Sequence, residues 1–583
     1  MRPAASPAHA LHGRTDSLVT EPLIASLSRR TWIALALIMT IVWFANLDGR
    51  KLLHPDEGRY AEIAREMVAT GNWVTPRVNG IKYFEKPALQ YWLTAASFEA
   101  FGINERAARL PTALAGFLTV VAIGWAGAVL ASPAVGVYSA AVLASCIWHF
   151  GISHILTLDA LLSFWLALAL VGFLLAQRAD ATPRSRERMM LVAYVATAGG
   201  IMTKGIVALA IPGTTLILYS LATRDFAPWK RLHIAKGLPL LLVLTVPWFV
   251  LVSVRNPEFA RFFFIHEHID RFLTKELKRP GPWWYFLPML VTGLLPWTGV
   301  FLWRLKASWR DAAVDAGGFS WARFCLIWSA FILVFFSISQ SKLPSYILPI
   351  FPAAALVLGW QLEAMSARPL SSLVALLAAT TGMLWGAAML GYPTVAIRLA
   401  DANTPLAIYV ALGPWVELGL GIMAAGYAVG WLLMRRGTTA ARSAAIAVIA
   451  ISTMLSMQAF FEGADVFRAT RSAADLVTAL ENASDPPYDR SAPFYQVRMY
   501  DQTLPFYLRR TTTLVAYRDE MGPGLDIQPE LAIPKVEDWI AHWNALPQGY
   551  ALMSPETLAM LVRDGVPMRV VARDPRRVLV ERR

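Results

Sequence analysis

The sequence predicts a mainly α-helical protein that crosses a membrane many times and carries a small α/β domain at its carboxyl end. The 583 residues are 56% hydrophobic, and the mean hydropathy of +0.46 is higher than a water-soluble domain usually has. About a dozen apolar stretches approach the roughly 20 residues that a helix needs to cross the hydrocarbon layer. Basic residues collect in alternate loops between these stretches, as they do in membrane proteins.

We expect about thirteen transmembrane helices, placed by length and apolar content. They fall at about 31–49, 111–130, 134–150, 160–177, 190–203, 206–222, 237–255, 285–303, 323–339, 346–362, 371–391, 407–433 and 443–461. Basic residues mark the cytoplasmic loops, so the amino terminus lies inside and the carboxyl tail outside. These residues are Arg29 and Arg30; Arg178, Arg184, Arg186 and Arg188; Arg224, Lys230, Arg231 and Lys236; Arg304, Lys306 and Arg310; and Arg435, Arg436 and Arg442.

The chain divides into three parts. Residues 1–30 form a cytoplasmic tail, and residues 31–461 form the membrane domain, with long outer loops at 50–110 and 256–284. In residues 462–583, strand-like pieces (FYQVRMY, TTLVAY, RRVLVE) alternate with helix-like ones (AADLVTALENA, VEDWIAHWNAL), which predicts an α/β domain outside the membrane. In the first loop, GRYAEIAREMVATG places Tyr60, Ile63, Ala64 and Met67 on one face, which predicts a helix lying at the membrane interface.

Two classes of function are disfavoured by composition. The net charge of +13 would suggest nucleic-acid binding in a soluble protein, but here many basic residues lie in loops that set topology. Cys146 and Cys325 both lie in apolar runs, so neither a disulfide framework nor a CxxC motif is available. We read both cysteines as packing residues.

Three acidic residues are candidates for catalysis. Asp56 and Glu57 occur in HPDEGRYAEIARE, directly after the first membrane helix, and Asp159 occurs in GISHILTLDALL between apolar runs. An unpaired charge at such a position costs a few kcal/mol, so Asp159 needs a partner or a cavity. Asp56 and Asp159 fall on the same outer face and are expected to meet at one site, although each alone is also compatible with a helix cap.

Several cations are predicted to form a phosphate site on the same face. Lys86 lies in IKYFEKPALQYW, Lys204 in GGIMTKGIVALAIPG, and Lys342 in SQSKLPSYILPI, which also contains Tyr346. Together with Arg271 they would suit a phosphate held at the membrane surface. The alternative for each cation is simple anchoring at the interface.

A divalent metal ion is a further prediction. FFFIHEHIDRFLTKELKRPGPWWYF contains His266, Glu267 and His268, and His-x-His beside carboxylates is able to bind zinc or a similar ion. A distant acid such as Glu85 would have to complete the site. The alternative is a solvated helix face, and no organic cofactor is expected.

The motifs HPDEGRYAEIAREM, FEKPALQYWL and ERAARLP resemble the first outer loop of the GT-C glycosyltransferases that use polyprenyl-phosphate sugars. Within that class, these motifs and the LTLDA and SKLPSYILP segments resemble the bacterial lipid A aminoarabinose transferases. Protein O-mannosyltransferases and oligosaccharyltransferases are more distant. The chain reads EKPAL where the family reads EKPPL, which is a mild departure.

The resemblance implies transfer of 4-amino-4-deoxy-L-arabinose from undecaprenyl phosphate to a lipid A phosphate, at the periplasmic face of the bacterial inner membrane. This modification would confer resistance to polymyxin and other cationic antimicrobial peptides. By motif matching, the resemblance assigns the essential acids to Asp56 and Asp159, with Glu57 beside them. The resemblance further implies that Lys86, Arg271 and Tyr346 hold the carrier phosphate and that Glu85 and His266 hold a metal ion. Lys204 and Lys342 are expected to join the phosphate site because of their position between apolar runs. The residues expected to contact the substrate are Arg59, Tyr60 and Tyr83.

Charge considerations suggest how such a reaction would proceed. Departure of the sugar leaves a phosphate whose growing negative charge is stabilised by fixed Lys and Arg side chains. A lipid A phosphate is already anionic, so no strong general base is required and Asp56 would position a group. For a hydroxyl acceptor Asp56 would instead be the base. No covalent nucleophile is evident, so inversion at the anomeric carbon is expected.

Two alternatives remain open at this stage. One is a GT-C enzyme that moves another sugar, such as mannose, to protein or glycolipid. The other is a lipid flippase or transporter, because charges within the membrane also mark transport paths. The long outer loops, the outer tail and the lack of matching halves with broken helices argue against transport. Expected partners are the lipid-linked donor, lipid A and membrane lipids, without nucleic acid.

Overall fold

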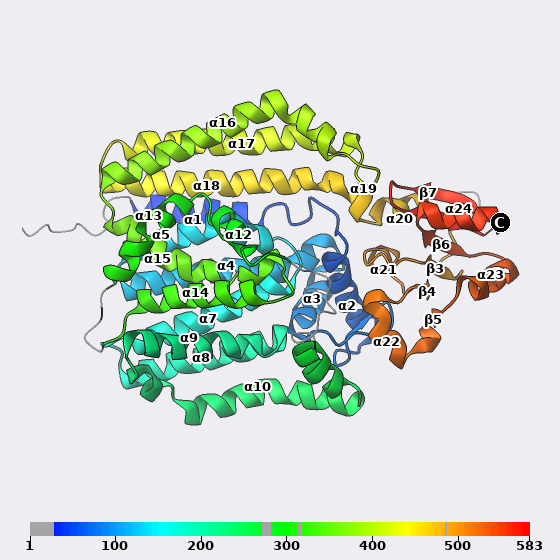
Figure 1. Cartoon of the computed structure of the whole chain (residues 1–583), viewed down its shortest axis with the longest axis horizontal. Helices are drawn as coiled ribbons and strands as arrows, with labels where there is room; N and C mark the ends of the chain where they lie inside the picture. The colour runs from blue at the N-terminus through cyan, green and yellow to red at the C-terminus, as the bar shows by residue number, and fades with distance from the viewer. Residues whose placement is uncertain (1–27, 271–280, 313, 315–317, 484–486, 583) are drawn as a thin grey trace, which may run out of the picture.

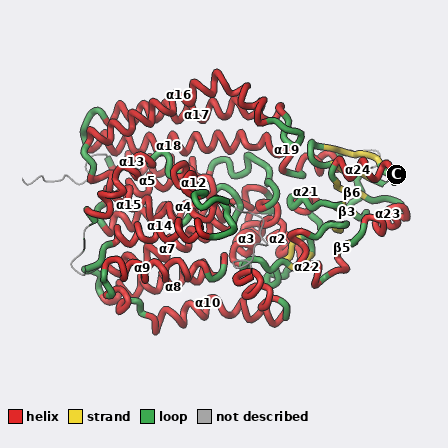
Figure 2. Tube along the Cα trace, in the orientation of Figure 1, coloured by secondary structure: helices red, strands yellow, loops and turns green. Residues whose placement is uncertain are grey.

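The computed structural model describes residues 28–270, 281–312, 314, 318–483 and 487–582. It is a mainly helical body from which an α/β domain projects at one end (Figure 1). Long helices run side by side along the body, while strands and loops collect toward the C-terminal end (Figure 2). This arrangement confirms the predicted fold class of a polytopic membrane protein with a C-terminal α/β domain.

Every predicted span coincides with a helix or with a pair of helices separated by a break. The helices of the body are α1 (Arg29–Phe44), α4 (Glu105–Leu130), α5 (Pro133–Ser145), α6 (Ile147–Ser153), α7 (Leu158–Gln177), α8 (Pro183–Lys204), α9 (Val207–Thr223), α10 (Ile234–Arg255), α12 (Phe286–Gly293), α13 (Thr298–Arg310), α14 (Trp321–Ile338), α15 (Ile350–Ala364), α16 (Ala367–Leu399), α17 (Leu406–Met434) and α18 (Thr439–Gly463). Within the described parts of the chain, seven helices are long and apolar enough to span a membrane, or nine if each of two bent pairs counts as one span. The predicted count of thirteen is therefore not confirmed, because helices such as α9 and α15 are short and α8 begins with the polar run PRSRERMM.

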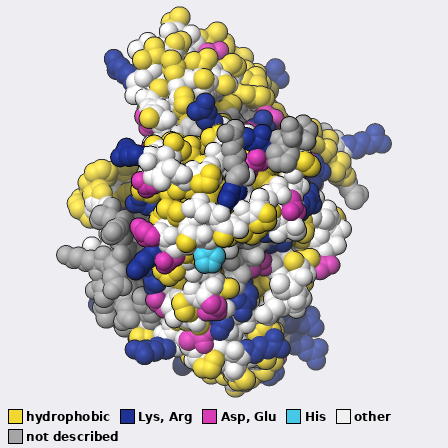
Figure 3. All heavy atoms as spheres, turned by 90° about the vertical axis from the view of Figure 1, so that its right-hand side faces the viewer, with side chains coloured by type: hydrophobic (Ala, Val, Ile, Leu, Met, Phe, Trp, Pro, Cys, Tyr) yellow, Lys and Arg dark blue, Asp and Glu magenta, His cyan; other side chains and the backbone are white. Residues whose placement is uncertain are grey.

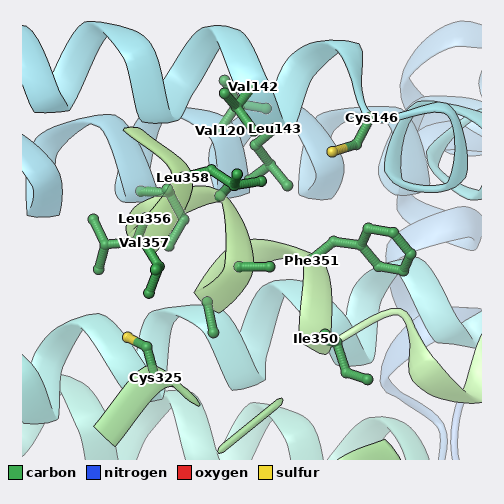
Figure 4. Close-up of a cluster of buried hydrophobic side chains, with 14 of the residues drawn as sticks. Val120, Val142, Leu143, Cys146, Cys325, Ile350, Phe351, Leu356, Val357 and Leu358 are labelled. Carbon is green, nitrogen blue, oxygen red and sulfur yellow. The ribbon is translucent and has the colours of Figure 1, made fainter. Parts of the chain in front are cut away.

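Helix α15 forms the centre of the membrane core. It is hydrophobic on all sides and buried over most of its length, as expected for a helix surrounded by other helices. Its residues pack against α4 and α5, and Cys146 and Cys325 lie in the same cluster (Figure 4). Both cysteines are buried free thiols, which agrees with a packing role.

Two of the helix pairs are sharply bent, and their breaks contact each other. The α5–α6 pair bends by 63° at Cys146, and the α12–α13 pair bends by 107°. The backbone N–H of Ile147 donates to the Leu295 carbonyl at 3.2 Å, and the Trp297 indole N–H donates to Ser145 Oγ at 2.9 Å. Backbone groups freed inside a membrane must find partners within the protein, so each break supplies partners for the other.

The loops that carry the predicted cytoplasmic charges lie at one end of the body, opposite the C-terminal domain (Figure 1). The loop between α1 and α4 lies at the other end and contains α2 (Asp56–Thr70), a short hairpin of β1 (Arg77–Val78) and β2 (Ile81–Lys82), and α3 (Leu89–Phe101). Viewed from this end, the surface carries interspersed charges of both signs (Figure 3). Such a surface suits contact with water.

Helix α2 is present as predicted, and it is enclosed by other parts of the protein. All residues from Glu57 to Met67 are buried, because α3 and β1 of the same loop and residues 504–508 of the C-terminal domain pack against the helix. At Gly58 a Cβ would lie 2.7 Å from the backbone of Gln502, so this close approach requires glycine. Helix α2 therefore lies between the rest of the first outer loop and the C-terminal domain, and its position at the membrane interface stays a prediction.

The C-terminal region begins with α19 (Arg468–Arg471) and α20 (Ala474–Glu481) and continues as a six-stranded mixed sheet of order β5-β4-β3-β6-β8-β7. The strands are β3 (Phe494–Val497), β4 (Thr513–Val515), β5 (Ala532–Ile533), β6 (Tyr550–Met553), β7 (Arg569–Arg573) and β8 (Val578–Glu581), and the helices between them are α21 (Leu504–Leu508), α22 (Gly522–Ile527), α23 (Val536–Ala545) and α24 (Pro555–Arg563). Strands β3 to β6 pair in parallel, whereas β8 pairs antiparallel with β6 and β7. Adjacent residues such as Phe494 and Tyr495 belong to separate hydrophobic clusters, because neighbouring side chains point to opposite faces of a strand.

A buried ionic network anchors the first outer loop to the membrane helices. Glu57 accepts hydrogen bonds from Arg50 Nη1 and Arg109 Nε, each at 2.8 Å. Arg109 also donates to the carbonyls of Leu47, Arg50 and Lys51. All three charged side chains are at most 5% exposed, so removal of one leaves another charge buried without its partner.

We predict that Arg109→Ala destabilises the protein by about 3–5 kcal/mol, the usual cost of breaking a buried ion pair. Arg106→Ala, on the same helix, removes a pair with Asp48 whose side chains are 61% and 53% exposed, and should cost at most about 1 kcal/mol. The thermal midpoint in detergent measures the difference. Equal midpoints for the two variants would contradict the assigned role of the network.

Candidate active site

Asp56 stands at the start of α2 and remains accessible while the residues that follow it are buried. Its Oδ1 accepts a hydrogen bond from Arg59 Nη1 at 3.0 Å, and its side chain is 46% exposed. The position in the first helical turn places the carboxylate at the positive end of the helix dipole. Asp56 is thus open to a bound molecule.

Asp159 lies in the first turn of α7 and has a partner on each oxygen. Lys204 Nζ donates to Oδ1 at 2.5 Å, and Ser345 Oγ donates to Oδ2 at 2.9 Å. The Lys204 ammonium lies 4.7 Å from the centre of the Tyr346 ring and close enough to Asp56 for their charges to interact. The structure thus brings together Asp56, Asp159, Lys204 and Tyr346, as the sequence predicted.

Glu57 differs from the other two acids because its carboxylate is fully enclosed. It accepts hydrogen bonds from Arg50, Arg109 and the backbone N–H groups of Leu53 and Leu156. Burial alone would raise the pKa of Glu57, but the charges of Arg109 and Arg50 hold it well below its ordinary value. The predicted catalytic role of Glu57 is therefore corrected to a structural one, because its buried carboxylate binds neighbouring arginines and backbone N–H groups and is not accessible to a substrate.

The predicted substrate residues form one wall beside Asp56. The Arg59 guanidinium lies 5.9 Å from the centre of the Tyr60 ring and 6.0 Å from that of Tyr83. Burial raises the pKa of both tyrosines well above the ordinary value, so their phenols stay protonated. Protonated phenols and a guanidinium supply hydrogen-bond donors and ring faces, which suit recognition of a polar sugar.

The C-terminal domain contributes Glu520 to this wall, which the sequence analysis did not single out. Glu520 pairs with Arg59 Nη2 and accepts a hydrogen bond from Gln502 Nε2 at 2.6 Å. Burial raises the pKa of Glu520, although the charge of Arg59 opposes the shift. No sequence signal marks this residue, because RDEMGPG reads as an ordinary polar turn.

Glu85 and Lys86 lie at the edge of the same wall. Lys86 Nζ donates to the Glu85 carbonyl at 2.7 Å. The Glu85 charge contributes to raising the pKa of Tyr83 and of Glu520, which places its carboxylate near both. The nearby Lys82 pairs with Glu258 at 2.6 Å and ties the β1–β2 hairpin to the end of α10.

Lys342 departs from the predicted phosphate cluster. Its Nζ donates to the carbonyls of Ser337 and Ser339 at 2.7 Å and of Phe336 at 3.4 Å. An ammonium has three donors, and here all three are used at the end of α14. The sequence-based role is corrected to a helix cap, since unsatisfied carbonyls at a helix end attract a cation.

Two predicted residues are not placed. Arg271 lies outside the described residues, and the side chain of His266 is likewise not described, although its backbone belongs to the helical segment Arg261–Asp270. Within the described residues no group of three His, Cys, Asp or Glu side chains is arranged to hold a metal ion. The phosphate role of Arg271 and the metal role of His266 stay predictions.

Comparison with known families gives two matches along the chain. Residues 482–582 match the aminoarabinose transferase C-terminal domain. Residues 28–263 match the dolichyl-phosphate-mannose-protein mannosyltransferase family. The two matched segments correspond to most of the C-terminal domain and to the membrane region that contains Asp56, Asp159 and Lys204.

Curated relatives carry one recurring name, undecaprenyl phosphate-alpha-4-amino-4-deoxy-L-arabinose arabinosyl transferase. The protein of Edwardsiella ictaluri is 34% identical over 56% of this chain and 59% of its own length. The second such protein of Sodalis glossinidius is 33% identical over 73% of this chain and 76% of its own length. The alignments with the first relatives therefore span about three fifths of those proteins.

A solved structure matches over nearly the whole chain. The crystal structure of ArnT from Cupriavidus metallidurans with bound undecaprenyl phosphate is 38% identical, with a TM-score of 0.88, and the match covers 95% of this chain and 98% of that one. The unliganded form of the same protein matches equally broadly, with a TM-score of 0.87. The chain therefore belongs to the family of undecaprenyl phosphate-alpha-4-amino-4-deoxy-L-arabinose arabinosyl transferases.

Proposed function

We propose that the chain is an inverting glycosyltransferase that moves 4-amino-4-deoxy-L-arabinose from undecaprenyl phosphate to a lipid A phosphate. The observation that carries this proposal is that the structure brings together Asp56, Asp159, Lys204 and Tyr346. The chain is also 38% identical to ArnT of Cupriavidus metallidurans, whose crystal structure contains undecaprenyl phosphate. The site faces the periplasm of the inner membrane in this proposal, which the position of the basic loops at the opposite end supports. The modified lipid A would attract polymyxin, a cationic peptide, less strongly, because its phosphate becomes less anionic.

In this proposal, the lysines bind the carrier phosphate and Asp56 positions a substrate. Lys204 and Lys86 hold the carrier phosphate with the help of Tyr346, and stabilise the charge that grows on it as the sugar leaves. Arg271 completes this cation set by prediction. The acceptor phosphate is already anionic, so Asp56 orients the aminosugar or the acceptor and need not remove a proton.

We predict that the chain restores the aminoarabinose mass to lipid A in cells that lack their own transferase, and that Asp56→Asn abolishes this addition. Mass spectrometry of lipid A is the measurement, with expression checked by immunoblot. Asp48→Asn is the matched control, because Asp48 lies on the same end of the molecule in an exposed pair, and it should retain full transfer.

Each possible result bears on a different part of the proposal. Full activity of Asp56→Asn would show that the Asp56 carboxylate is not needed for transfer. No addition by well-expressed wild-type chain would favour transfer of another sugar, such as mannose, which the match of residues 28–263 to mannosyltransferases makes the second candidate. Consumption of a purified mannosyl-phosphate lipid carrier by the protein would then identify mannose as the transferred sugar.

The wall formed by Arg59 and Glu520 generates a prediction about the C-terminal domain. Glu520→Gln leaves Arg59 without a buried charge partner and should lower kcat/KM about tenfold, the effect of roughly 1.4 kcal/mol. Asp526→Asn is the control, since it removes an exposed pair with Arg518 in the same domain. Equal kcat/KM for the two variants would show that the C-terminal domain does not shape the sugar site.

We propose separately that Glu85 and His266 bind a divalent metal ion. The proposed transfer needs no organic cofactor. A carboxylate and an imidazole are ligands that zinc accepts, and Glu85 lies beside the substrate wall. We predict that purified protein contains about one equivalent of zinc or a similar ion, and that Glu85→Gln lowers this content. Elemental analysis measures it, and full transfer by metal-free, chelator-treated enzyme would contradict the proposal.

A further inference from the structure

Among the residues that the structure describes, Ser345 is the neutral side chain that donates a hydrogen bond to Asp159. It lies in the 3-10 turn Pro344–Ile347 between α14 and α15, and its Oγ donates to Asp159 Oδ2 at 2.9 Å. Lys204, from the end of α8, occupies Oδ1 at 2.5 Å. The two carboxylate oxygens are therefore held from two different elements, which fixes the plane of the carboxylate.

The turn that carries Ser345 is itself held in place. The Trp148 indole N–H on α6 donates to the Pro344 carbonyl at 3.1 Å, and the Leu348 N–H donates to the Ser345 carbonyl at 3.0 Å. Tyr346 packs its ring against Phe336 of α14, with centroids 5.1 Å apart. Lys342 closes the end of α14 just before the turn.

Trp148 in turn belongs to the broken helix pair in the membrane core. Helix α6 begins at Ile147, whose N–H bonds to Leu295 of the α12–α13 break. Gly293 lies against Trp148, since a Cβ there would be 2.8 Å from Trp148 Cβ. A continuous series of contacts thus runs from the two helix breaks to the Ser345 hydroxyl.

We propose that Ser345 is a positioning residue that orients Asp159 and thereby holds Lys204 toward the carrier phosphate; this rests on the proposed function. The ammonium of Lys204 has three donors, and Asp159 takes one of them among the described contacts. A carboxylate held by Lys204 alone is free to turn and to accept from Lys204 with either oxygen. The hydroxyl of Ser345 prevents this, so the other two donors keep a constant direction.

The first test is a set of three substitutions in the full chain. Ser345→Ala should raise the Kd for undecaprenyl phosphate about threefold and lower kcat about tenfold, because the contact of Lys204 with phosphate strengthens as charge grows during the reaction. Ser345→Thr keeps the hydroxyl and should restore both values to within about twofold. Ser339→Ala is the control on the same segment, because Ser339 Oγ donates to the Ser341 carbonyl and does not touch Asp159.

A double-mutant cycle tests whether Ser345 acts through Asp159. In an Asp159→Asn background, Ser345→Ala should change the Kd for undecaprenyl phosphate less than about 1.5-fold. An undiminished threefold change in that background, or no change in the wild-type background, would overturn the proposal. If the wild-type chain transfers no aminoarabinose, the proposed function fails, while the binding cycle still decides the role of Ser345.

Discussion

The ion pairs of Glu57 with Arg50 and Arg109 are the interaction on which the site depends. Glu57 follows Asp56 in sequence, and it also accepts the backbone N–H of Leu156, three residues before Asp159. One buried carboxylate therefore joins the two segments that carry the exposed acid and the lysine-paired acid. Because burying it costs several kcal/mol unless all partners are present, the segments hold one relative position.

Charge balance explains how two charged side chains are accommodated in a mostly buried position. Asp159 and Lys204 are mostly buried, at 13% and 18% exposure, and neutralise each other at the end of the apolar helices. The Tyr346 ring provides a second favourable surface for the ammonium. In the proposed reaction, a phosphate next to this pair would meet a cation that is already oriented, so little reorganisation would be needed as charge develops on it.

Sequence reasoning identified charged residues from the apolar character of their own segments, but it did not identify their partners. Asp159 and Lys204 were identified because a charge between apolar runs needs a partner, and the structure pairs them. Lys342 showed the same pattern, but its partners are carbonyls of its own helix end, which composition does not distinguish from an anion. Glu57 has one partner nearby in sequence, Arg50, but its other partner, Arg109, lies 52 residues away. The partner of Glu520, Arg59, lies 461 residues away, so neither environment was evident from the local sequence. The membrane body followed from hydropathy and the C-terminal α/β domain from alternating strand-like and helix-like segments. The exact number of spans did not follow, because the chain contains short and broken helices.

The C-terminal domain has no catalytic motif, yet the site is not separable from it. It covers α2, whose charged face needs partners: Arg59 meets Glu520, and Arg65 donates to the Arg509 carbonyl at 3.3 Å. The side chain of Asn79 forms a reciprocal pair with the backbone of Thr512, with both bonds at 2.7 Å, which orients the hairpin that leads to Tyr83 and Glu85. Without the domain these polar groups would face water, and the helix that begins with Asp56 would lose the contacts that it makes with α21. The domain therefore acts on the membrane site by fixing the loop that carries its first acid.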